Sequence, residues 1–248
     1  MPGGCSDSRT DADDRPLQAF LLGTLALDAA VALQRRLVYE VASGGTPSVI
    51  VCDHPPGISI GREGSRGHIR PSPEALAARR WPVTWVSRGG GCLLHLPGQV
   101  ACYPILPLQD LGTTPGRYID TLNRVAAETV RAFGARCEPT TGEAGVRVAG
   151  RRIAHVGVCV RDWVSSFGIV MNVTPDLEPF RDVRCDGDPV PMTSLQRESP
   201  ARVRVTGVRQ SLLEGVARRF GFTRVSVFHH HPTFLPKPTR HAFAPRSR

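Results

Sequence analysis

Apolar residues recur every three or four positions in three long stretches of this chain. This spacing puts the apolar side chains on one face of a helix, and it predicts helices over residues 17–42, 115–133 and 206–220. Gly44-Gly45 follows the first stretch and Gly221 follows the third. Glycine is a common residue just beyond a helix end, so these positions indicate where two of the helices stop.

A shorter helix and several strands are expected between the long helices. Ser72 is a good N-cap and Pro73 suits the first helical position, which predicts a helix over residues 72–80. Short runs rich in β-branched residues predict strands over residues 49–52, 58–60, 83–86 and, in succession, 146–173, with one helical turn at 176–180. Because these elements alternate irregularly, we predict an α+β fold with a mixed β-sheet packed with helices.

The chain is long enough for one large domain with a hydrophobic core. It has 248 residues, of which 41% are hydrophobic. Residues 1–15 are polar and acidic, which predicts a disordered tail, and residues 16–228 are expected to form a single domain. Residues 229–248 are rich in proline, histidine and arginine, which predicts an irregular tail in which His229, His230 and His231 are solvated rather than bound to a metal.

Cysteine usage and hydropathy indicate the compartment. The chain has seven cysteines, an odd number, and no CxxC pair, which argues against a disulfide framework or a structural zinc site. No run approaches the ~20 apolar residues of a membrane span. The N-terminal residues lack the basic and then apolar order of a secretory signal. We therefore expect a cytoplasmic protein with reduced thiols, no metal and no membrane association.

The chain is basic, with a formal charge of +9, and Lys237 is its only lysine among 31 basic residues. The arginines are spread along the sequence without a dense basic block or interleaved aromatic residues, so nucleic acid is not an expected partner. A basic surface suits an acidic protein partner instead. The protein itself is expected to be a monomer.

The stretch VSRGGGCLLHLPGQVACYPILPL, residues 86–108, combines polar and apolar features. Arg88 precedes three glycines, which allow backbone N–H groups to approach a ligand closely. Arg88 supplies a fixed charge for a polar head group, and His95 follows the glycines. The apolar run over residues 100–106 is suited to a hydrocarbon. The stretch therefore predicts a pocket for a molecule with one polar and one apolar end.

Two other positions carry candidate chemistry. Cys185 lies in the polar loop RCDG beside Arg184, and a nearby cation lowers the pKa of a thiol, which makes Cys185 a candidate nucleophile. The competing interpretation is an inert cysteine, which is the commoner case. Asp53-His54 is either a functional dyad or an aspartate that accepts backbone hydrogen bonds at the Pro55-Pro56 turn.

Several blocks occur in the order found in one known family: DHPPGISIGREG, SRGGGCLLHLPGQVACYPILPL, GVRVAGRRIAHVGVCV, MNVTPDLEPF and TSL. On these blocks, from about residue 27 to residue 222, the chain resembles the lipoyl(octanoyl) transferases, also called lipoate-protein ligase B, of the biotin/lipoate protein ligase superfamily. The resemblance implies a biotin/lipoate protein ligase-like single domain, with residues 16–228 as an octanoyltransferase-like catalytic domain.

The resemblance also implies an activity. Members move an octanoyl group from octanoyl-acyl carrier protein to a lysine of lipoyl domains, in 2-oxoacid dehydrogenases or the glycine cleavage H protein. The acyl group rests on an enzyme cysteine as an acyl-thioester, which splits the transfer into two steps. No ATP or other cofactor is required, because the thioester of the donor is already activated.

Carried over by position, the resemblance implies an acyl-binding site made from three segments of the chain. Its residues are Arg88, Gly89, Gly90, Gly91, Cys92, Leu93, Leu94, His95, His155, Val156, Gly157, Gly168, Ile169 and Val170.

The chain departs from the family at the reacting groups. Arg152 stands where the family has its catalytic lysine, and an arginine stabilises a thiolate as a fixed cation but is a poor base. Counting from Phe180 puts Asp186 at the position of the nucleophilic cysteine, with Cys185 one residue earlier. An aspartate nucleophile would form a readily hydrolysed anhydride. We therefore take Cys185 as the candidate nucleophile, with Arg152 as its electrostatic partner and Asp186 beside it.

A second hypothesis is a catalytically degenerate relative that binds acyl chains or lipoyl domains without turnover. The simultaneous loss of the family's lysine and of its cysteine position motivates it. An ATP-dependent ligase is disfavoured, because such ligases also rely on a core lysine.

Overall fold

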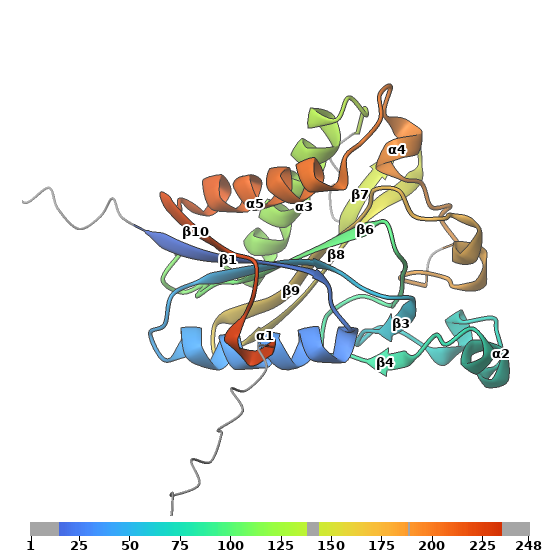
Figure 1. Cartoon of the computed structure of the whole chain (residues 1–248), viewed down its shortest axis with the longest axis horizontal. Helices are drawn as coiled ribbons and strands as arrows, with labels where there is room; N and C mark the ends of the chain where they lie inside the picture. Colours follow the sequence, from blue (N-terminus) through green and yellow to red (C-terminus); the bar gives the residue numbers. More distant parts are fainter. Residues whose placement is uncertain (1–14, 138–143, 188, 235–248) are drawn as a thin grey trace, which may run out of the picture.

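The computed structural model describes residues 15–137, 144–187 and 189–234. Its centre is a seven-stranded mixed sheet with the order β10-β1-β2-β6-β9-β8-β7 (Figure 1). The strands are β1 (Pro16–Thr24), β2 (Ser48–Asp53), β6 (Gln99–Ile105), β7 (Gly145–Val148), β8 (Arg151–Arg161), β9 (Val164–Asn172) and β10 (Arg224–Phe228). β10, β1 and β2 run parallel, and every other neighbouring pair in the sheet is antiparallel.

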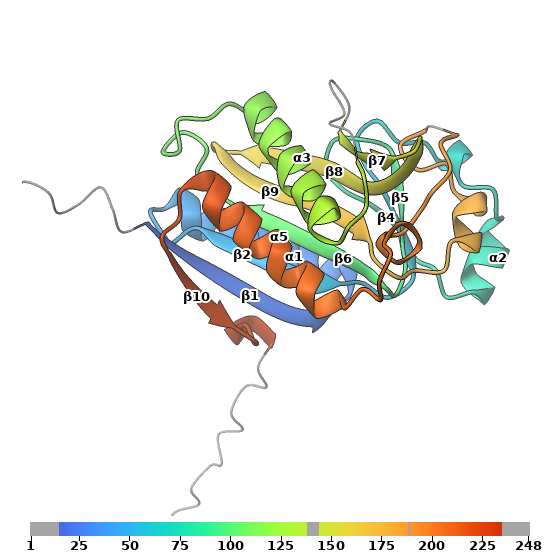
Figure 2. The ribbon, with the colours of Figure 1, turned by 90° about the horizontal axis from the view of Figure 1, so that it is seen from above.

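Helices cover both faces of this sheet, so the molecule has three layers (Figures 1 and 2). Helix α1 (Leu27–Ala42) lies on one face, where Leu33 and Leu37 pack with Ile50 of β2. Helices α3 (Pro115–Ala132) and α5 (Val205–Phe220) lie on the other face and contact each other. Their apolar side chains form the larger core with the sheet. Burial of these apolar side chains is the main stabilising contribution to such a fold.

A second sheet lies on the α1 side of the main sheet (Figure 1). Its three strands have the order β4 (Val83–Trp85), β3 (Gly57–Ile60) and β5 (Cys92–His95). Five short helical segments complete the description: η1 (Arg66–His68), α2 (Pro73–Ala78), η2 (Glu178–Asp182), α4 (Leu195–Glu198) and η3 (Pro232–Phe234). The small sheet has its own apolar cluster, which includes Ile58, Ile60, Leu94 and Phe180.

The predicted fold class is confirmed, and most predicted helices are present. The structure has α3 and α5 within two residues of their expected ends, and Gly221 adopts the left-handed conformation after α5. Ser72 caps α2 as expected, since its Oγ accepts a hydrogen bond from the backbone N–H of Ala75.

The helix expected over residues 17–42 is wrong in its first third. Residues 16–24 form strand β1, and the helix starts only at Leu27. β1 lies between β2 and β10 and is covered by helices on both faces of the sheet, so its sequence is a nearly continuous apolar run. Such a run cannot be told from a helix by periodicity. Strand β10 was also not predicted, because its five residues are exposed at the sheet edge.

The expected N-terminal tail, except Arg15, and residues 235–248 of the expected C-terminal tail lie outside the described residues. His229 and His230 are exposed, as expected. His231 is not solvated: it is 4% exposed and packs edge-on against Phe20 of β1, with ring centroids 4.8 Å apart. We retain residues 16–228 as the proposed domain. The packing of His231 against Phe20 holds the residues just beyond this domain against the main sheet. Within the part of the chain that the structure describes, no helix is long and apolar enough to cross a membrane.

Candidate active site

The candidate site lies between the main sheet and the small sheet, where the glycine run Gly89, Gly90 and Gly91 meets residues 184–187. The two segments touch backbone to backbone. A Cβ built on Gly91 would lie 2.7 Å from the Cα of Asp186, and one on Gly90 would lie 2.9 Å from its Oδ1. Gly90 also has a φ of 78°, which disfavours larger residues. Gly90 and Gly91 are therefore required by the close approach of the loop that carries Asp186.

The backbone N–H groups of the glycine run are already used within the protein. Gly89 donates to the carbonyl of Val158 at 2.9 Å, and Gly90 donates to Oε1 of Glu63 at 3.2 Å. Gly91 donates to Oδ1 of Asp186 at 2.9 Å. The expectation that these donors face a ligand is therefore not met in this structure: the run binds two of the protein's own carboxylates, those of Glu63 and Asp186, instead.

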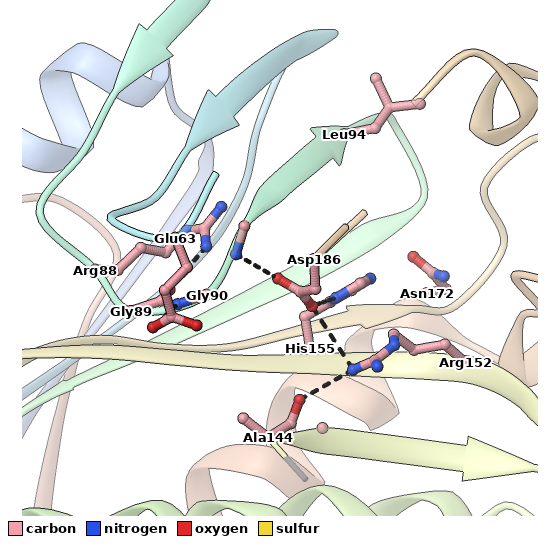
Figure 3. Close-up of polar contacts among 12 residues, drawn as sticks. Glu63, Arg88, Gly89, Gly90, Leu94, Ala144, Arg152, His155, Asn172 and Asp186 are labelled. Carbon is pink, nitrogen blue, oxygen red and sulfur yellow. Dashed lines mark hydrogen bonds and ion pairs between the residues drawn. The ribbon is translucent and has the colours of Figure 1, made fainter. Parts of the chain in front are cut away.

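The Asp186 carboxylate is central to the site, because it contacts three residues from two segments of the chain, the glycine run and β8 (Figure 3). Its Oδ1 accepts from Gly91, and its Oδ2 lies 2.8 Å from Nδ1 of His155 and 3.6 Å from Nη1 of Arg152. Burial raises the pKa of the Asp186 carboxyl, but the hydrogen bond from His155 and the positive charges of Arg152 and Arg88 outweigh it. The net effect holds that pKa well below its usual value, so Asp186 is ionised at neutral pH.

His155 is buried, with 4% of its surface exposed. Burial lowers the pKa of the imidazole and outweighs the opposing effect of Asp186, so the ring is neutral at pH 7. Because an ionised carboxylate only accepts hydrogen bonds, Nδ1 must carry the proton that it donates to Asp186. Nε2 then carries a lone pair, and it is buried without a hydrogen-bond partner among the described residues.

Both side chains line a cavity between the two sheets, called the central cavity below. Its lining residues are Leu27, Ser59, Arg88, Leu93, His95, Tyr103, His155, Val156, Gly157, Phe167, Gly168, Val170 and Asp186. The space open to the centre of a water-sized sphere is about 20 Å³, which is room for about one water molecule. A larger ligand therefore enters only if the walls separate.

A second set of polar side chains borders the cavity on the side of the small sheet. Arg88 donates from Nη2 to Oγ of Ser59 at 2.9 Å, and that Oγ lies 2.9 Å from Nε2 of His95. His95 packs edge-on against His54, with ring centroids 5.1 Å apart. His54 Nδ1 contacts the carbonyl of Leu25 at 2.7 Å and must donate to it. Its Nε2 therefore accepts from the Tyr103 hydroxyl at 2.8 Å.

These buried histidines predict a loss of stability in mild acid. Burial lowers the pKa values of His54, His95 and His155 below the ordinary 6.5. Above pH 7 they are neutral in both the folded and the unfolded chain. As the pH falls below 6.5, the unfolded chain binds protons that the folded protein does not, so the free energy of unfolding falls. The urea midpoint is therefore expected to be lower at pH 5.5 than at pH 7.5.

The control for this prediction is His230→Gln, which changes an exposed histidine and should leave the pH dependence unchanged. His95→Gln should reduce the dependence, because one buried group no longer titrates. Equal midpoints at the two pH values in the unsubstituted protein would contradict the burial of these rings.

The structure brings together most, but not all, of the residues that the resemblance implied. Eight of them line the central cavity: Arg88, Leu93, His95, His155, Val156, Gly157, Gly168 and Val170. Cys92 and Leu94 instead belong to the apolar cluster of the small sheet, and Ile169 faces the α3 and α5 side of the main sheet. Successive side chains of a strand point to opposite faces, so a contiguous block cannot lie wholly in one pocket.

The candidate catalytic residues also lie in two different places. Asp186 lines the cavity and forms an ion pair with Arg152, whereas Cys185 is 1% exposed in the apolar cluster of the small sheet. Burial raises the pKa of the Cys185 thiol to about 12, and the neighbouring Arg88 lowers it only slightly. In this arrangement the thiol must leave its cluster before it can act as a nucleophile, so that role stays a prediction.

Four cavity residues were not anticipated: Leu27, Ser59, Tyr103 and Phe167. Ser59 and Tyr103 lie inside matched blocks, but nothing in the sequence shows that they face a histidine. Phe167 has a φ of 58°, an uncommon value for a large residue.

Asp53 and His54 do not form a dyad, and Asp53 does not serve the expected turn. The Asp53 carboxylate pairs with Arg209 of α5, while His54 bonds to Leu25 and Tyr103. Across the described residues, no group of three or more histidine, cysteine, aspartate or glutamate side chains is arranged to hold a metal ion.

Residues 27–217 match the family described as the lipoyl protein ligase A/B catalytic domain. The chain is 36% identical over 200 residues to the octanoyltransferase of Citrifermentans bemidjiense, which covers 80% of this chain and 93% of that protein. It is 35% identical over 207 residues to the octanoyltransferase of Syntrophobacter fumaroxidans, with coverages of 82% and 91%.

Solved structures share the fold at lower identity. A lipoate-protein ligase A bound with ATP superposes with a TM-score of 0.66 at 14% identity, over 88% of each chain. A putative lipoate protein ligase from T. acidophilum with bound lipoic acid gives a TM-score of 0.63 at 14% identity, over 87% of this chain and 89% of that one.

Proposed function

This chain belongs to the lipoyl protein ligase A/B catalytic domain family, with octanoyltransferases among its relatives, and on that basis we propose that it is an acyltransferase. It transfers an octanoyl-class acyl group from the thioester of acyl carrier protein to a lysine amine of a lipoyl domain. The observation that carries this proposal is the central cavity, which has charged groups at one end and apolar walls at the other.

The cavity matches an acyl thioester in its distribution of polarity. Arg88, His155 and Asp186 form the polar end, where the reacting carbonyl would lie. Leu93, Phe167 and Val170 supply apolar surface for the hydrocarbon. Because the cavity has room for about one water molecule, binding of an eight-carbon chain requires these apolar side chains to separate.

The overall charge suits the two expected protein partners. The chain has a formal charge of +9 at pH 7. Donor and acceptor groups in this family are carried on acidic proteins, and a basic surface speeds the encounter with such partners at low salt. No ATP is needed, because the thioester already provides an activated acyl group.

A second candidate function is binding of acyl chains or lipoyl domains without turnover. Two observations favour it. Cys185 lies in an apolar cluster with a raised pKa, and a carboxylate, Asp186, stands at the cavity instead of a thiol. In addition, no lysine occurs among the described residues, since the only lysine of the chain is Lys237.

The two candidates predict different products when the protein is mixed with octanoyl-acyl carrier protein and a lipoyl domain. Transferase activity adds one octanoyl group to the lipoyl domain, seen in its intact mass, and a domain whose acceptor lysine is replaced by arginine gains none. Binding without turnover gives a complex with unchanged masses. Unchanged masses without a complex would contradict both functions.

The covalent route through Cys185 has its own test in the same reaction. If the acyl group rests on this thiol, the enzyme gains an octanoyl mass that maps to Cys185. The Cys185→Ser variant then forms no acyl-enzyme and loses transfer. A Cys185→Ser variant that transfers at the unsubstituted rate would exclude this thiol as the nucleophile.

A further inference from the structure

We propose that His155, oriented by Asp186, is the general base of this reaction, and that the acyl group passes directly from the donor thioester to the acceptor amine. This inference rests on the proposed acyl transfer, because it names the group that would drive that transfer. It is carried by the contact between the imidazole and the fixed carboxylate (Figure 3), and by the position of both side chains in the lining of the central cavity.

Both the carboxylate of Asp186 and its backbone are held by other groups, so the carboxylate fixes the imidazole rather than following it. Oδ1 of Asp186 accepts the N–H of Gly91, and the backbone N–H of Asp186 donates to the carbonyl of Cys92 at 2.9 Å. Arg152 lies 3.6 Å from Oδ2. Oδ2 then receives the proton on Nδ1 of His155 at 2.8 Å, which sets both the tautomer and the orientation of the ring.

The other ring nitrogen is available for chemistry. Nε2 of His155 is buried and has no hydrogen-bond partner among the described residues, although the residue lines the cavity. An unpaired buried nitrogen is unfavourable unless a ligand supplies the missing hydrogen bond. In aspartate–histidine systems with a serine, this nitrogen faces the serine hydroxyl. Here the acceptor amine would take the corresponding place once the cavity walls separate.

The remaining groups of the site suit this role. Arg88 lines the same cavity and provides a fixed positive charge for the carbonyl oxygen, where negative charge develops. Arg152 carries a charge but is too basic to accept a proton from an amine. The Cys185 thiol is enclosed in the small-sheet cluster. His95 also lines the cavity with a buried ring nitrogen that has no hydrogen-bond partner within the described part of the chain, but its ring contacts a serine hydroxyl. Of these two described histidines, His155 is the one that a carboxylate orients.

The proposed step balances without any co-reactant. The neutral lysine amine attacks the thioester carbonyl carbon and forms a C–N bond, while Nε2 of His155 takes a proton from that nitrogen. The C–S bond then breaks, and the same proton passes to the leaving sulfur. The products are an octanoyl amide on the acceptor and a free thiol on the carrier, and His155 returns to its neutral form.

The test compares His155→Gln and Asp186→Asn with the unsubstituted protein in single-turnover transfer to the lipoyl domain. Glutamine keeps a donor for Asp186 but has no basic nitrogen, so transfer should fall about a hundredfold or more. Asparagine removes the acceptor that sets the tautomer, so a fall of similar size is expected. Binding of octanoyl-acyl carrier protein should remain within about threefold. His230→Gln is the matched control and should transfer at the unsubstituted rate.

The pH profile separates a base from a merely structural residue. The charged or titratable groups that face His155 are Asp186, Arg152, Arg88 and His95, and burial holds the pKa of His95 well below its ordinary value. The rate for the unsubstituted protein should fall below pH 6.5 as His155 is protonated, and this acid limb should disappear in His155→Gln. An effect of His95 would persist in the variant.

Three outcomes would overturn the inference. They are a folded His155→Gln variant with transfer within threefold of the unsubstituted rate, an unchanged acid limb in that variant, or an octanoyl group on the enzyme during turnover. If His155→Gln does not fold, Asp186→Asn decides by the same criteria. If the unsubstituted protein transfers no acyl group at all, the proposed function itself fails, and this step fails with it.

Discussion

Replacing Asp186 by cysteine is expected to give an enzyme that carries an octanoyl group as a stable adduct. The Asp186 side chain lines the central cavity, is 22% exposed, and lies beside His155 and Arg152. A thiol in this position would have an imidazole and a guanidinium as neighbours, and both stabilise a thiolate. This environment is the opposite of that of Cys185, whose thiol is enclosed by apolar side chains and has a pKa raised to about 12.

The measurement is the intact mass of Asp186→Cys after incubation with octanoyl-acyl carrier protein, followed by mapping of the modified peptide. The unsubstituted protein should gain no octanoyl group, whereas Asp186→Cys should gain about one octanoyl group per molecule, at position 186. Asp176→Cys, which puts a thiol on the surface, is the matched control and should stay unmodified on the same timescale. Equal labelling of the two variants would contradict the assignment of the cavity as the acyl site.

The second large effect is expected from Gly91→Ala. An added Cβ would lie 2.7 Å from the Cα of Asp186 and 2.9 Å from its carbonyl carbon, and these are backbone atoms that no side-chain rotation can move. The loop must therefore shift, which breaks the hydrogen bond between Gly91 and Asp186 and frees the carboxylate from its position. We expect transfer to fall about a hundredfold and the free energy of unfolding to fall by about 1–3 kcal/mol.

Gly116→Ala is the control for this substitution. Gly116 lies in the first turn of α3 with no atom within 4 Å of an added Cβ, and alanine is the better helix former. This variant should transfer normally and unfold at the same or a slightly higher temperature. Normal transfer by Gly91→Ala would show that the glycine run does not position Asp186.

Hydrophobic periodicity identifies an element when one of its faces is buried and the other is exposed. Helix α3 was predicted within one residue of its ends, because its apolar face alternates with an exposed polar one. β1 was taken for a helix because it is buried between two strands and two helix layers, which removes the alternation that marks a strand. β10 was missed for the reverse reason, since an exposed edge strand has no buried face to give a pattern.

Residues of the site could be predicted from the sequence, but the contacts between them could not. Motif resemblance located Arg88, His155 and Gly168, and all three line the cavity. It could not show that Asp186 contacts His155, because 31 residues separate them and the contact depends on the path of residues 184–187. Cys185 forms a β-bridge with Cys92 of the small sheet, and Asp186 follows it in a turn with a φ of 54°, so the local path of the loop decides which of the two faces the cavity.

The most direct test of the central claim is the intact mass of every protein in one rapidly quenched turnover. The unsubstituted protein, octanoyl-acyl carrier protein and a lipoyl domain would be mixed in equal amounts and sampled throughout the reaction. We expect the octanoyl mass to leave the carrier and reach the lipoyl domain while the mass of the enzyme never changes. An octanoyl group that reaches the enzyme before the lipoyl domain would contradict direct transfer, and a carrier that keeps its octanoyl group would contradict acyl transfer altogether.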